Sequence, residues 1–186
     1  MRKFSIVLIG ALASLGLAGS ASALNIAFGP HEVSGSNIEA EVTFELQNDS
    51  RLVMQLSVNE GKVGRARVQT VSEDGDIRTI LGAGAEKTSH SLVNISRIRI
   101  NKYTGNVDFF FRQSFFHEHI HAGQSSEKFY VDYADLAAGD LVTFSGYRHW
   151  IFGSFGSVTV PIVPEPSAAV MVGLGMVGLA IAGRKR

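Results

Sequence analysis

The stretch Ile38-Glu39-Ala40-Glu41-Val42-Thr43-Phe44-Glu45-Leu46 is the clearest indication of the fold class of this chain. Apolar residues take every second position, and the positions between them hold glutamates and one threonine. A two-residue period is that of a β-strand with one buried face and one face in water. Because antiparallel sheets commonly have one such wet face, the stretch favours an antiparallel arrangement.

The same alternation returns after a short polar turn. Leu52–Val58 is again extended, and the turn residues Asn48-Asp49-Ser50 between the two runs predict a β-hairpin. Loops are expected at Gly82–Ala85 and Gly153–Ser157, and one helical turn or a corner at Asp135–Gly139. Further extended runs are predicted at Val63–Val71, Ile77–Leu81, Ser91–Tyr103, Val107–Ile120, Phe129–Tyr133, Leu141–Phe144, Tyr147–Phe152 and Val158–Val163.

No helix of about ten residues is predictable between Leu24 and Pro164 by apolar periodicity. Roughly nine strands at turn spacings of about 8 to 12 residues, without helical crossovers, are typical of an all-β fold. We therefore predict an antiparallel β-sandwich or jelly roll.

The N-terminal segment has the three parts of a secretory signal peptide. Met1-Arg2-Lys3 is basic, Phe4–Leu17 is apolar, and Ala21-Ser22-Ala23 is an A-x-A cleavage site. Cleavage between Ala23 and Leu24 by signal peptidase, after passage through the general secretion machinery, is therefore expected.

The C-terminal segment combines a short motif, an apolar run and a basic end. The motif is Val163-Pro164-Glu165-Pro166-Ser167, and the 17 residues of Ser167–Gly183 carry no charge. As a helix this run is roughly 25 Å long, just enough to cross a bilayer core. The final Arg184-Lys185-Arg186 is a basic stop that keeps this end in the cytoplasm.

This order of parts resembles the PEP-CTERM sorting signal of exported proteins in Gram-negative bacteria. The resemblance covers about an eighth of the chain. It implies transient anchoring in the inner membrane and processing by an exosortase-like membrane enzyme. The protein would then be released to the cell surface or extracellular matrix. Its role there would be linked to exopolysaccharide or biofilm. The resulting domain division is 1–23 signal peptide, 24–162 β-sandwich domain and 163–186 sorting tail.

The charge of the central segment differs from that of the whole chain. The 17 basic and 17 acidic residues balance, but five of the basic ones lie in the two terminal segments. Residues 24–166 therefore carry 12 basic against 17 acidic residues, a net charge of −5. This acidity argues against a nucleic-acid partner. The chain has no Cys, which excludes disulfides and thiolate chemistry.

Three alternating histidines form a candidate metal site. His117, His119 and His121 would share one strand face, with neighbouring side chains about 7 Å apart. Glu127 or His149 would complete a site for one divalent transition metal. His119-x-His121 followed by Glu127 is faintly similar to the cupin metal motif. The alternative is a rim where histidines meet water beside a core, with no cofactor.

Two arginine pairs form a candidate glycan site. Arg65-x-Arg67 and Arg97-x-Arg99 each place two guanidinium groups on one strand face, which suits the carboxylates of acidic sugars. The alternative is two wet faces that never meet. Aromatic residues that would stack on sugars are Phe109, Phe110, Phe111, Tyr147, Trp150 and Phe152.

No catalytic residue set is recognisable in the sequence. The first functional expectation is thus a non-enzymatic, exported structural or adhesive protein linked to exopolysaccharide. The alternative is a periplasmic or surface metal-binding protein or cupin-like metalloenzyme that uses the histidine cluster.

Overall fold

The computed structural model describes residues 24–26, 29–35, 37–86, 93–112, 119–148 and 154–164. Within these ranges the chain forms strands and no helix, and Leu24–Pro164 is one compact unit. The predicted all-β, antiparallel class is confirmed. No helix in the described part of the chain is long and apolar enough to cross a membrane. The expected signal peptide and the expected C-terminal helix lie outside it.

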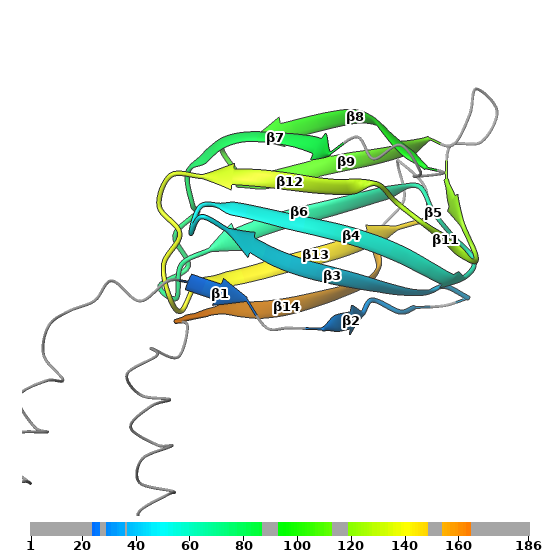
Figure 1. Cartoon of the computed structure of the whole chain (residues 1–186), viewed down its shortest axis with the longest axis horizontal. Helices are drawn as coiled ribbons and strands as arrows, with labels where there is room; N and C mark the ends of the chain where they lie inside the picture. The colour runs from blue at the N-terminus through cyan, green and yellow to red at the C-terminus, as the bar shows by residue number, and fades with distance from the viewer. Residues whose placement is uncertain are drawn as a thin grey trace, which may run out of the picture. The chain divides into compact units, whose positions relative to one another are not determined.

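The strands make two large sheets (Figure 1). The front sheet, drawn nearer the viewer, has the order β2-β3-β4-β12-β7, with β11 also on β4; the back sheet has the order β1-β14-β13-β6-β9-β8. β5 and β10 form a small third sheet, and the pairs between strands are antiparallel. The strand bounds are β1 Leu24–Ile26, β2 Pro30–Glu32, β3 Glu39–Gln47, β4 Arg51–Glu60, β5 Lys62–Val63, β6 Arg65–Val71, β7 Ile80–Glu86, β8 Asn94–Asn101, β9 Asn106–Arg112, β10 Ile120–His121, β11 Gln124–Ser125, β12 Lys128–Tyr133, β13 Leu141–Tyr147 and β14 Ser154–Pro164.

The core lies between the inner faces of the two sheets, as in a β-sandwich. The ring of Phe129 on β12 lies 4.6 Å from that of Phe109 on β9, and Phe44 on β3 meets Phe144 on β13 at 6.3 Å. These aromatic pairs connect the sheets through side chains that are almost entirely buried. The alternating pattern of the sequence thus sets which side of each strand faces the core.

The stretch from residue 38 to residue 46 has the predicted structure. β3 pairs with β4 in a hairpin around Asn48 and Asp49, which both have φ near 53°. Asn and Asp are among the few residues that adopt this left-handed conformation at low cost. The predicted hairpin is therefore confirmed, and its turn residues are the ones that permit it.

The expected loop at Gly82–Ala85 is wrong, because these residues belong to β7. Gly84 lies opposite Tyr130 of β12, and the Tyr130 ring occupies the space where a side chain at Gly84 would be. The small residues that suggested a loop instead let an aromatic ring lie flat across the edge strand.

Three other expectations need correction. Ser154–Ser157, expected in a turn, begin β14, and β13 is one continuous strand from Leu141 to Tyr147. The predicted strand Val63–Val71 is divided into β5 and β6 at Gly64, where a Cβ would press on the His119 ring. The segment Asp135–Gly139, by contrast, is a corner, which was one of the two predicted alternatives, and Gly139 has φ 94°.

Candidate functional site

The four arginines singled out in the sequence lie on one face of the back sheet. β9 lies between β6, which carries Arg65 and Arg67, and β8, which carries Arg97 and Arg99. The arginines of β6 alternate with the buried residue Ala66, so they point away from the core. We call these four side chains the arginine face.

The first row across this face alternates aromatic rings with guanidinium groups. In register order it runs Tyr147, Arg65, Phe110, Arg97. The guanidinium carbon of Arg65 lies 3.8 Å from the centre of the Tyr147 ring, and that of Arg97 lies 5.8 Å from the centre of the Phe110 ring. Such cation–π contacts hold the long arginine side chains against the sheet while leaving their charge in place.

The second row has a carboxylate at its centre. Asp108 lies between Arg67 and Arg99 in register, and Arg67 donates to it through Nε at 2.8 Å and Nη2 at 3.1 Å. This forked hydrogen bond raises the pKa of Arg67 above its ordinary value. Arg65 Nε is 3.9 Å from the same carboxylate. Asp108 therefore fixes the two arginines of β6.

The two arginine pairs share a face, with one strand between them. β9 separates them, so Arg65 and Arg67 are anchored near the middle of the sheet. Arg97 and Arg99 lie on the edge strand β8 and are exposed. The four arginines and Asp108 give the face a net charge of +3, in a segment whose overall charge is −5. The concentration of positive charge makes this face the strongest candidate for contact with an anionic partner.

The aromatic candidates divide between core and surface. Phe109 and Phe111 are fully buried core residues, so they are not available as sugar platforms. Phe110 and Tyr147 point outward and are 8% exposed, being covered in part by the arginines described above. Trp150 and Phe152 lie outside the described residues.

The histidine cluster is described only in part. The rings of His119 and His121 lie 6.4 Å apart, edge to face, whereas His117 and His149 are outside the described residues. The carboxylate of Glu127 is buried and accepts a hydrogen bond of 2.6 Å from the backbone N–H of Ile95. Within the described ranges, no group of three or more His, Asp or Glu side chains could hold a metal ion. The metal site stays a prediction.

Three residues of the two expected processing signals lie in paired strands at the ends of the domain, and the others lie outside the described residues. Leu24 begins β1, Val163 and Pro164 end β14, and Leu24 pairs with Pro164. The backbone N–H of Leu24 donates to Asp49 Oδ1 at 2.8 Å. The other signal residues lie outside the described ranges: Ala21, Ala23, Glu165, Pro166, Ser167, Arg184, Lys185 and Arg186.

Sequence reasoning missed Asp108, which organises the arginine face. Its signal was a single acidic residue at an outward position of the otherwise apolar run Val107–Phe111. A charge inside such a run is expected to have a partner, but its identity depends on which strands are neighbours.

No protein-family model matches the chain, and no match was found among the curated proteins or the solved structures.

Proposed function

We propose that this is an exported, non-enzymatic protein with a structural or adhesive role at the cell surface or in the extracellular matrix of a Gram-negative bacterium. Residues 1–23 act as signal peptide, and residues 163–186 act as a PEP-CTERM-like sorting tail with a transmembrane helix. Signal peptidase and an exosortase-like enzyme process the two ends. The order of motif, apolar run and basic cluster in the tail supports this proposal.

The partner that fits the central domain is an acidic exopolysaccharide. The observation that carries this part is the arginine face, where two guanidinium pairs lie on one side of one sheet, on β6 and β8 with β9 between them. Guanidinium groups bind carboxylates through two parallel hydrogen bonds, and a surface with two such pairs matches a polymer better than a single small ligand.

Export is tested by mass spectrometry of the surface and secreted fractions. The expected product begins at Leu24 and ends close to Pro164-Glu165-Pro166. Replacing Arg184, Lys185 and Arg186 by Glu should misplace the tail, because these residues hold it at the cytoplasmic side. Recovery of the intact chain in the cytoplasm would contradict the proposal.

Polymer contact is tested by co-sedimentation of the purified protein with a polyuronate and with a neutral glucan. The expected result is binding to the polyuronate alone, lost in the double variant Arg97→Gln, Arg99→Gln. These two arginines are chosen because they are exposed and do not anchor Asp108. Arg51→Gln, on the front sheet, is the matched control and should bind as the unchanged protein does. Equal binding to both polymers would exclude the arginine face as the reason.

A further inference from the structure

The outward face of the front sheet is acidic where that of the back sheet is basic. Glu32 of β2 lies opposite Glu41 of β3, and Glu39 of β3 lies opposite Glu60 of β4. Like charges directly opposite each other on paired strands are destabilising. We call these four glutamates the acidic band. Their mutual repulsion would be relieved by a positively charged partner.

Neither the acidic band nor the edge of the arginine face is neutralised within the described part of the chain. The ion pairs of the front sheet, Arg51 with Asp132 and Lys128 with Glu45, use other carboxylates. No ion pair among the described residues includes a member of the acidic band, or Arg97 or Arg99. The acidic band and the two arginines of β8 are thus opposite charges that form no ion pair with each other within the described residues.

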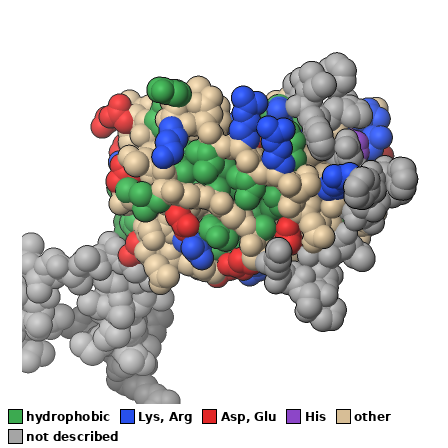
Figure 2. All heavy atoms as spheres, turned by 90° about the horizontal axis from the view of Figure 1, so that it is seen from above, with side chains coloured by type: hydrophobic (Ala, Val, Ile, Leu, Met, Phe, Trp, Pro, Cys, Tyr) green, Lys and Arg blue, Asp and Glu red, His purple; other side chains and the backbone are tan. Residues whose placement is uncertain are grey.

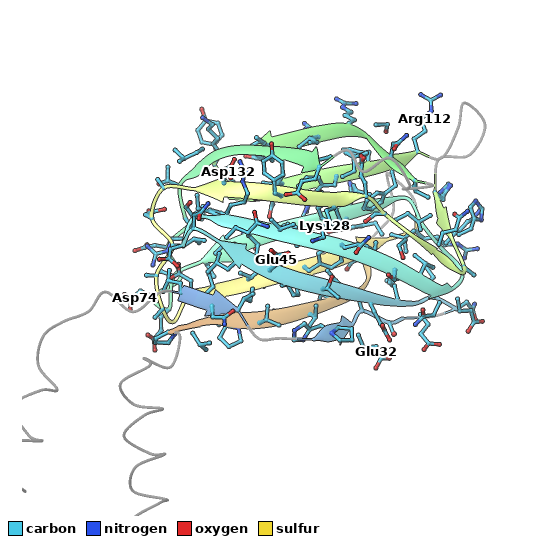
Figure 3. The ribbon with its side chains drawn as sticks, viewed as in Figure 1. Glu32, Glu45, Asp74, Arg112, Lys128 and Asp132 are labelled. Carbon is cyan, nitrogen blue, oxygen red and sulfur yellow. The ribbon has the colours of Figure 1, made fainter. Side chains whose placement is uncertain are left out.

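The two charged regions lie on opposite sheets, and each extends from the middle of its sheet to one edge strand. β8 is the last strand of the back sheet, whereas β2 is the first strand of the front sheet. In Figure 1 β8 lies at the top of the domain and β2 at the bottom. Figure 3 places Glu32 at the lower edge and shows Glu45 directed toward Lys128 farther up the front sheet. Figure 2 looks at the domain from above, so its top and bottom are not those of Figure 1; on the side that it shows, most Lys and Arg side chains lie apart from most Asp and Glu side chains.

We propose that the arginine face of one copy of this chain docks on the acidic band of a second copy. The partner is chosen by charge complementarity and by spacing. Arg97 and Arg99 are two residues apart on outward positions of β8, as Glu39 and Glu41 are on β3. Side chains two apart on a strand repeat at about 6.8 Å, so both guanidinium groups reach a carboxylate at once.

This contact is heterologous, so it does not close at two copies. The docking surfaces belong to opposite sheets, so a pair of copies still presents one free arginine face, on one copy, and one free acidic band, on the other. The arginine face is part of the back sheet, and the whole outward face of that sheet, with six strands that average about seven residues, measures roughly 29 by 24 Å. Its area, about 700 Å², lies just below the roughly 800 Å² per partner of a standard interface. Association is therefore weak, extends into open stacks, and depends on salt.

The test is sedimentation velocity of residues 24–164, the compact unit to which every strand pair described above belongs. At about 0.01 M salt, where charges act over about 30 Å, the mean sedimentation coefficient should rise continuously with protein concentration. At about 1 M salt, where the range is about 3 Å, the protein should be monomeric. A monomer at every concentration in low salt overturns the proposal, and so does association that stops at the dimer.

Charge reversal distinguishes this contact from non-specific attraction. The variant Arg97→Glu, Arg99→Glu places two carboxylates where the docking arginines were. The variant Glu39→Lys, Glu41→Lys places two ammonium groups where the docking carboxylates were, so each variant alone opposes like charges across the proposed contact. Each alone should be monomeric at low salt, and an equimolar mixture should associate again. The substituted side chains are exposed or half-exposed, and unchanged melting temperatures would show that both variants fold. Association of either variant alone to the level of the unchanged protein would overturn the proposal.

The outcome is separable from that of the polysaccharide proposal. Self-association requires no polymer and no sorting tail, so it succeeds or fails in buffer alone. Because both contacts use Arg97 and Arg99, an added polyuronate should compete with a second copy and lower the sedimentation coefficient at low salt. Association seen only after the polymer is added would favour polymer bridging and overturn the direct contact between copies.

Discussion

Two aspartates show how burial decides what an ion pair contributes. Asp140 accepts from Nε of Arg78 at 2.8 Å and also from its Nη2, and Asp132 accepts from Arg51 in the same forked geometry at 2.7 and 3.2 Å. The side chain of Asp140 is 1% exposed, whereas that of Asp132 is 27% exposed. Asp140 also accepts from the backbone N–H of Ala137 and so holds the corner before β13.

We expect Asp140→Asn to lower the free energy of unfolding by about 2–3 kcal/mol, because Arg78 would lose the carboxylate of its forked hydrogen bond in a largely buried place and keep the more distant Asp135, at 3.9 Å. Asp132→Asn, the matched change at the more exposed of the two pairs, should cost less than Asp140→Asn, about 1 kcal/mol or below. Urea unfolding of the two variants measures both values. Equal costs would show that burial does not govern these pairs.

Tyr133 links the sheets through a hydrogen bond inside the core. Thr70 Oγ1 on β6 donates to Tyr133 Oη on β12 at 2.8 Å, and the tyrosine is 1% exposed. Burial raises the pKa of Tyr133 above its ordinary value of 10.0, because the charged phenolate would be poorly solvated there.

A raised pKa in the folded state means that stability is full below the unfolded pKa of about 10 and is lost as the pH rises above it. We therefore expect the melting temperature to fall above about pH 10, and to fall less steeply in Tyr133→Phe. The comparison of the two slopes is the measurement, since lysines and arginines titrate in both proteins. Parallel curves would contradict the assignment to Tyr133.

At the scale of the elements, strand periodicity was predictable from sequence and strand ends were not. β3, β4 and β12 follow the alternation of their residues, because one face of each meets the core. β7 was not recognisable, since Gly82-Ala83-Gly84-Ala85 carries no alternating apolar pattern. Its place is fixed by pairing with β12 and by the Tyr130 ring, which are tertiary contacts.

Two glycines in β7 give a matched test of this explanation. A Cβ at Gly84 would overlap the Tyr130 ring, which also stacks under Arg51 at 4.1 Å, whereas a Cβ at Gly82 has its nearest neighbour, Asp132 Oδ2, at 3.8 Å. We expect Gly84→Ala to destabilise the domain by about 1–2 kcal/mol. Gly82→Ala should be neutral or stabilising by up to about 1 kcal/mol, because it removes backbone freedom from the unfolded chain. Thermal unfolding compares them, and equal effects would exclude the ring contact as the cause.

At the scale of the whole molecule, the candidate site depended on strand order, which the sequence does not reveal. The two arginine pairs could be recognised in the sequence. That they share one face follows from the position of β9 between β6 and β8, which the sequence does not show. β6 and β8 are separated in the chain by β7, which belongs to the other sheet. Asp108 was overlooked for the same reason, because its partner Arg67 is 41 residues away.

Residues 24–164 are expected to fold without the two terminal segments and without sensitivity to reducing agent. The two-sheet core is made within this unit, and the chain has no Cys to oxidise. Circular dichroism should show a β spectrum with one cooperative thermal transition, unchanged by dithiothreitol. A helical spectrum, or loss of structure on reduction, would contradict this expectation.

Because β1 pairs with β14, the two ends of the domain lie side by side, and the domain should still fold if its ends are moved to another loop. Leu24 lies opposite Pro164, and directly opposed residues on antiparallel strands are about 5 Å apart. A linker of a few residues should therefore join them, with new ends opened beside Tyr103, which is 94% exposed in the turn between β8 and β9. We expect this circular permutant to keep the melting temperature of the original domain within a few degrees. The same two sheets would then form although the strands follow one another along the chain in a different order.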